Sequence, residues 1–217
     1  MQYDLVFEGG GAKGMVFVGA LEVFEAHGHT AGRLLGTSAG AITATFVAAG
    51  YSSAEMVDAL GERQPDGHSV FSNFLSLPVP LDAAAIRQSQ LRAALRAVNV
   101  DWIPDPLEET LDDRLAEVMA ADPRLRQVFA FVERGGLYGA ENFLAWMRRR
   151  LDTGNYHGKL RRFSQLNLAQ FYDATGVDLS LIGSDTTASN MLVLNHRTAP
   201  DLPLVWAVRM SMSFPLL

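Results

Sequence analysis

The sequence contains no cysteine among its 217 residues. This absence excludes disulfide bonds, a cysteine nucleophile and cysteine-ligated zinc sites. It leaves the redox compartment of the protein open.

Positive charge is also scarce. The formal net charge is −6, from 18 Lys and Arg residues against 24 Asp and Glu residues. The chain therefore lacks the basic surface that a phosphate backbone requires, and nucleic acid is not expected as a partner. The local arginine runs at 148–150 and 161–162 are attributed to a solvated helix face in preference to a site for anionic lipid headgroups.

Long apolar runs are missing as well. No stretch approaches the roughly 18 uninterrupted apolar residues of a spanning helix, and the start MQYD lacks the basic and apolar regions of a signal peptide. We expect a cytoplasmic protein whose membrane contact, if it has one, is peripheral. Because 48% of the residues are hydrophobic and no charge block occurs, the length favours one globular domain over residues 1–217.

The first fifty residues alternate between strand and helix patterns. Residues 3–8 are apolar and β-prone, and a glycine loop at 9–14 follows them. A helix is predicted from 15 to 27, where Gly28 ends it in the left-handed conformation. A second strand at 33–35 and a buried helix at 41–49 come next. This order predicts a doubly wound α/β fold with a mainly parallel sheet flanked by helices.

The middle of the chain has a different pattern. Residues 54–172 are predicted to be largely helical and to form an insertion or cap, which completes a single domain. Asn167 and Gln170 have the spacing of a capping box, with Gly176 as the stop of that helix. The remaining predicted elements are helices at 82–98, 108–121, 124–133, 140–152 and 203–213 and strands at 179–183 and 191–195.

One pentapeptide carries a nucleophile pattern. Gly36, Thr37, Ser38, Ala39 and Gly40 match G-x-S-x-G, in which a serine occupies a sharp turn between a strand and a helix. A predicted strand precedes this pattern and a predicted buried helix follows it, as the motif requires. Ser38 is therefore the candidate nucleophile, and the dipole of the following helix favours negative charge beside it.

The glycine loop is the second chemical feature. Gly9, Gly10, Gly11, Lys13 and Gly14 can direct consecutive backbone N–H groups toward an oxyanion. The loop also fits the dinucleotide pattern G-x-G-x-x-G, but no acidic residue for a ribose stands near the end of the second strand. A P-loop would need Ser or Thr directly after the lysine, where this chain has glycine. A glycine turn without a ligand remains open as an alternative.

Three blocks together resemble the patatin-like phospholipase family. They are FEGGGAKG at 7–14, GTSAG at 36–40 and AVRMSMSFP at 207–215. The resemblance implies a Ser–Asp dyad with Ser38 as the nucleophile and the Gly10 and Gly11 amides as oxyanion donors. It also implies a lipid or phospholipid acyl ester as substrate, without a metal ion or cofactor.

The aspartate of that dyad is not found in this sequence. The family has it in an Asp-Gly-Gly or Asp-Gly-Ala motif after the third block, so we expect it beyond residue 217 or on a second chain. Asp66, before Gly67, is attributed to a turn. The resemblance implies that Asp185 stands at a strand end and is structural. Residues 1–217 alone are then expected to be nearly inactive, and an inactive lipid-binding or scaffold domain is the alternative.

A Ser–His–Asp triad is a further alternative. Of the five histidines, only His157 and His196 follow Ser38 at a suitable distance along the chain. Both fit surface loops better, and His196 is the stronger candidate of the two.

Overall fold

The computed structural model describes residues 1–80, 82–90, 93, 110, 113–115, 117–119 and 121–213. They divide into two compact units. The first consists of Met1–Phe74 and Glu141–Ser213, and the second lies within Leu75–Ala140. Of the predicted helical segment 54–172, the central residues thus form a separate unit, while the residues on either side belong to the first.

The first unit is built on a four-stranded mixed sheet. Its strands are β1 (Gln2–Phe7), β2 (Thr30–Thr37), β5 (Leu179–Asp185) and β6 (Asn190–Leu194), in the order β1-β2-β5-β6. β1, β2 and β5 run parallel, and β6 pairs antiparallel with β5. The predicted sheet with mainly parallel strands and flanking helices is confirmed.

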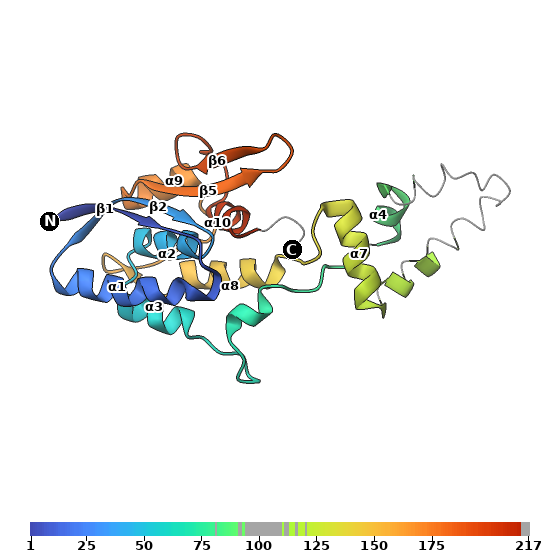
Figure 1. The fold of residues 1–217 in the computed structure, drawn as a ribbon, viewed down its shortest axis with the longest axis horizontal. Coiled ribbons are helices and arrows are strands. Elements are labelled where there is room, and N and C mark those ends of the chain that lie inside the picture. The colour runs from blue at the N-terminus through green and yellow to red at the C-terminus, as the bar shows by residue number, and fades with distance from the viewer. Residues whose placement is uncertain are drawn as a thin grey trace. The chain divides into compact units, whose positions relative to one another are not determined.

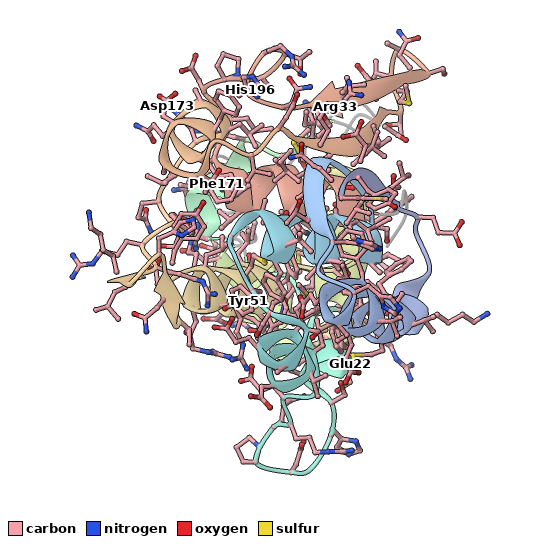
Figure 2. All side chains as sticks on the ribbon, turned by 90° about the vertical axis from the view of Figure 1, so that its left-hand side faces the viewer. Glu22, Arg33, Tyr51, Phe171, Asp173 and His196 are labelled. Carbon is pink, nitrogen blue, oxygen red and sulfur yellow. The ribbon has the colours of Figure 1, made fainter. Side chains whose placement is uncertain are left out.

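Helices pack against this sheet, as Figure 1 shows. On one side lie α1 (Met15–Ala26), α2 (Ala39–Ala48), α3 (Ser53–Leu60) and α8 (Glu141–Leu151), and α10 (Leu204–Met212) packs beside β5. Nearly all of α2 is buried because its residues are small or apolar. Figure 2 shows Arg33 of β2 on the opposite side of the sheet from Glu22 of α1 and from Tyr51.

Several local signals in the sequence are confirmed. Gly28 follows α1 with a φ of 67°. Asn167 and Gln170 form a reciprocal capping box at the start of α9 (Leu168–Thr175), and Gly176 ends that helix with a φ of 68°.

Residues 155–162 differ from the expectation. A two-stranded hairpin, β3 (Asn155–Tyr156) and β4 (Lys159–Leu160), turns through His157 and Gly158 with φ values of 48° and 79°. The helix-face interpretation of the basic run at 161–162 is wrong for Arg161, whose side chain is only 1% exposed.

The second unit contains α4 (Ala83–Arg87) and α7 (Pro123–Arg134). Ile86, Met119 and Phe129 pack together as its apolar core. The helices predicted at 124–133 and 140–152 are confirmed, whereas the one predicted at 82–98 is interrupted after Arg87. Of the helix predicted at 108–121, the described residues 110, 113–115, 117–119 and 121 are helical. The other residues of that segment, most of 91–98 and the apolar tail at 214–217 lie outside the described residues.

The two segments of the first unit meet where the second unit begins and ends. The short 3-10 helix η2 (Val70–Asn73) closes the first segment, and α8 opens the second. The Asn142 side chain donates to the backbone carbonyl of Asn73 at 3.1 Å and to its side-chain oxygen at 2.9 Å. These bonds hold the end of the first segment and the start of the second side by side.

Within the described ranges, none of the helices has both the length and the apolar character needed to cross a membrane.

Candidate active site

Ser38 lies between the end of β2 and the start of α2. Its backbone has φ 53° and ψ −121°, a left-handed conformation that few residues other than glycine adopt. Such a conformation costs about 1–3 kcal/mol and persists only where the surrounding structure enforces it. The side chain is half-buried, and the strand–turn–helix context predicted for G-x-S-x-G is present.

The glycines two residues before and after Ser38 permit this bend. A methyl group at Gly36 would lie 2.5 Å from the Gly40 carbonyl oxygen. One at Gly40 would lie 2.5 Å from the carbonyl carbon of Phe7 and 2.6 Å from the Glu8 carbonyl oxygen. Real Cβ atoms do not approach backbone this closely, so α2 can meet the end of β1 only without side chains here.

The glycine loop packs directly against this bend. A methyl group on Gly9 would be 3.3 Å from Cβ of Ser38, and one on Gly14 would be 3.0 Å from Cβ of Ala39. Residues Gly11–Gly14 form a 3-10 turn, closed by the Lys13 N–H donating to the Gly10 carbonyl. Within the described part of the chain, no acceptor engages the N–H groups of Gly10 or Gly11. Both remain available to a ligand.

Two spaces adjoin the loop. A cavity of about 420 Å³ is lined by residues that include Gly9, Gly10 and Lys13. A narrower apolar pocket of about 20 Å³ lies between Gly14, Ala39 and Phe71. The second space holds little more than one water molecule unless its side chains move.

The backbone of Ser38 is held by a residue that the sequence reasoning did not single out. The Ser38 N–H donates to Oγ of Ser211 on α10 at 3.0 Å, and that hydroxyl donates to the Ile182 carbonyl of β5 at 2.6 Å. The only sequence signal was the position of Ser211 inside the third resembling block, where no role was assigned to it.

Arg161 anchors the other end of α2. Its Nε donates to the carbonyl of Ala49, and its terminal nitrogens donate to the carbonyls of Gly50 and Thr153 and to both carboxylate oxygens of Glu55, at 2.7–3.0 Å throughout. The hydrogen bond from Arg161 holds the pKa of Glu55 below its ordinary value of 4.5. The helix that begins at Ser38 is therefore fixed at both ends.

Of the aspartates considered from sequence, Asp66 lies in a turn, and Asp185 is the last residue of β5 and bonds the turn that follows. Oδ1 of Asp66 accepts the N–H of His68 at 3.0 Å, and Oδ1 of Asp185 accepts the N–H groups of Thr187 and Ala188. Both carboxylates therefore act as local turn acceptors.

The histidine alternative is not supported by the geometry. His196 stacks on Tyr172, with ring centroids 3.8 Å apart, and its Nδ1 is 3.9 Å from Asp178. Figure 2 shows it near Asp173, on the α9 side of the sheet. Asp178 precedes β5, whereas Ser38 follows β2. Leu34 pairs with Leu179 in parallel register, so Asp178 is level with the residue before Leu34. Along the strand direction, Asp178 and Ser38 are therefore five residues, about 16 Å, apart. His157 is in the hairpin turn described above.

The comparisons with known proteins agree with the resemblance of the three blocks. A model of the patatin-like phospholipase family matches residues 5–217. The chain belongs to this family, whose members in general hydrolyse acyl esters of lipids.

Individual relatives are more distant. The uncharacterized protein YqhO of Bacillus subtilis is 32% identical over 222 residues, which cover 99% of this chain and 56% of YqhO. The crystal structure of VipD from Legionella pneumophila has 14% identity and a TM-score of 0.49, covering 98% of this chain and 42% of VipD. ExoU of Pseudomonas aeruginosa, solved in complex with SpcU, has 22% identity and a TM-score of 0.48, covering 99% of this chain and 38% of ExoU. The chain thus spans about half the length of YqhO, the curated relative.

Proposed function

We propose that this protein is a serine lipid acyl hydrolase in which Ser38 attacks the carbonyl carbon of a lipid or phospholipid acyl ester. The observation that carries the proposal is the left-handed backbone of Ser38, held between β2 and α2 with the glycine loop packed against it. A strained non-glycine residue at a sharp strand-to-helix turn is typical of an activated nucleophile.

The oxyanion of the tetrahedral intermediate is assigned to the glycine loop. The N–H groups of Gly10 and Gly11 have no acceptor within the described residues, and Gly9 brings the loop against Ser38. Donors that are already in place cost no reorganisation when charge develops on the ester oxygen. The N-terminal end of α2 adds its positive dipole at the same point.

The general base is the aspartate of a dyad, supplied by a C-terminal segment beyond residue 217 or by a second chain. Asp66 and Asp185 are engaged in turns, and His196 lies at the far ends of the parallel strands. General-base assistance is worth about 10²–10⁴ in rate. Residues 1–217 alone should therefore hydrolyse esters very slowly.

A lipid substrate fits the surroundings of the loop. Met15 and Val16, at the start of α1, are 40% and 72% exposed although both are apolar. They stand next to Lys13, which can meet an anionic headgroup, and this favours peripheral contact with a membrane. The acyl chain would enter at the apolar pocket beside Ala39 and Phe71, and the side chains of this small pocket must move to admit it. The mechanism uses no metal ion and no cofactor.

The test is covalent labelling of the full-length gene product with a fluorophosphonate probe, followed by mass spectrometry of the labelled peptide. We expect the label on Ser38 and its complete loss in Ser38→Ala. A folded full-length protein that takes up no label would refute the hydrolase and would favour the inactive lipid-binding or scaffold domain.

A further inference from the structure

The amide of the candidate nucleophile is bound by a side chain from a distant part of the chain. Ser211, 173 residues after Ser38, accepts the Ser38 N–H at 3.0 Å. Ser211 is only 8% exposed, so water does not readily take its place. This hydroxyl group thus joins the backbone of Ser38 to α10.

The direction of both hydrogen bonds is fixed by their chemistry. A serine hydroxyl has one proton to donate and lone pairs to accept. The Ile182 carbonyl, 2.6 Å away, can only accept, and the Ser38 N–H can only donate. The proton of Ser211 must therefore point to Ile182 and a lone pair to Ser38, which leaves no other arrangement of this pair of bonds.

The same bonds exclude two other roles for Ser211. Its proton is committed to the carbonyl of Ile182 in β5, and no basic side chain among the described residues bonds to it, so it is not set up as a second nucleophile. The hydroxyl also occupies the Ser38 N–H, and this removes that amide from the set of oxyanion donors. Only amides that find no acceptor among the described residues, such as those of Gly10 and Gly11, are left for that task.

We propose that Ser211 is a positioning residue for Ser38: its hydroxyl clamps the left-handed backbone of the nucleophile to Ile182 in the middle of β5 and keeps the Ser38 amide out of the oxyanion site. The inference rests on the proposed function, because it assumes that Ser38 reacts. Its geometric part, the hold on the Ser38 backbone, stands on the two hydrogen bonds alone.

The experiment compares Ser211→Ala with two variants in the full-length protein. Ser211→Thr retains the hydroxyl group. Ser213→Ala removes an exposed hydroxyl that only donates to the Arg209 carbonyl at 2.9 Å, one turn of helix away, and so serves as the matched control. Loss of the clamp lets the reacting oxygen shift, and a shift of about 1 Å costs on the order of 100-fold in rate.

We expect the rate of fluorophosphonate labelling and kcat to fall by about 10- to 100-fold in Ser211→Ala, with KM nearly unchanged. Ser211→Thr should restore most of the rate, and Ser213→Ala should match the wild type. Wild-type labelling and kcat in a folded Ser211→Ala protein would overturn the proposal. If Ser211→Ala does not fold, Ser211→Cys, a weaker donor and acceptor of similar shape, takes its place with the same expected direction.

Amide hydrogen exchange separates this inference from the proposed function. Protection of the Ser38 N–H should be high in the wild type and in Ser211→Thr, and lost in Ser211→Ala. If the wild type takes up no label, the proposed function fails, while the exchange rates still decide whether Ser211 holds the Ser38 backbone. Equal protection in all variants would overturn the clamp whatever the labelling shows.

Discussion

Replacing Arg161 by lysine is the sharpest test of how α2, the helix that follows Ser38, is anchored. The guanidinium has five N–H groups, and all five are used: one each for the carbonyls of Ala49, Gly50 and Thr153 and two for Glu55. Lysine supplies three N–H groups from a single nitrogen. At least two of the five acceptors therefore lose their donor in Arg161→Lys, although the positive charge is kept.

The size of the effect follows from these two acceptors. A lost partner costs about 1–3 kcal/mol for each buried polar group, which gives about 2–6 kcal/mol. The Glu55 side chain is 39% exposed, so water can replace part of its loss, and we take the low end of this range, about 2–3 kcal/mol. For a chain of this size each kcal/mol lowers Tm by about 2–4 °C, so Tm should fall by about 4–12 °C.

The assay is thermal unfolding of the wild type, Arg161→Lys and Arg162→Lys. Arg162 is the neighbouring residue and is exposed, so its replacement should leave Tm within about 1 °C of the wild type. A Tm for Arg161→Lys that equals the Tm of Arg162→Lys would show that the hydrogen bonds to Ala49 and Gly50 contribute nothing to stability. The anchoring argument would then be wrong.

Three further predictions, which use four substitutions, test other parts of the structure. Gly40→Ala should prevent folding into the active form, because its methyl group would overlap the Phe7 backbone. Its control is Gly19→Ala in α1, where the added methyl meets open space and should stabilise the protein by up to about 1 kcal/mol. Soluble yield and urea unfolding distinguish the two variants. Phe71→Ala widens the apolar pocket and should raise kcat/KM for long-chain relative to short-chain nitrophenyl esters, and an unchanged chain-length profile would mean that the acyl chain binds elsewhere. Glu55→Gln removes a carboxylate whose pKa is lowered in the folded state. The stability that this carboxylate contributes is present above pH 4.5 and is lost as the pH falls through the lower folded pKa. The difference in unfolding free energy between wild type and variant, measured in urea, should therefore be widest at pH 7 and should narrow below pH 4.5.

Much of the sheet unit could be predicted because its signals are local. Strand, glycine loop, helix and second strand follow one another within fifty residues, and the glycine positions fix where each helix ends. The spacing of G-x-S-x-G likewise predicted the strand–turn–helix context of Ser38. The capping box was predicted from the spacing of Asn167 and Gln170 alone.

What the sequence did not reveal depends on contacts between distant residues. Ser211 meets Ser38 only because α10 packs beside β5, and no local pattern encodes that pairing. Arg161 looked like part of a surface run, but the ends of α2 and α8 surround it and bury it. Burial of a charged side chain follows from the acceptors that tertiary structure collects around it, so a charge pattern alone could not predict it.

The hydrogen bonds between Asn142 and Asn73 have a consequence for how such a chain can change over time. The bonds between Asn73 and Asn142 belong to the first unit and do not involve the residues between them. The segment between these two asparagines could therefore be shortened, lengthened or exchanged at little entropic cost. A different segment can then be inserted between these two points without re-forming the strands and the glycine bend of the first unit. Relatives that share the strands and the glycine bend are free to diverge most between these two asparagines.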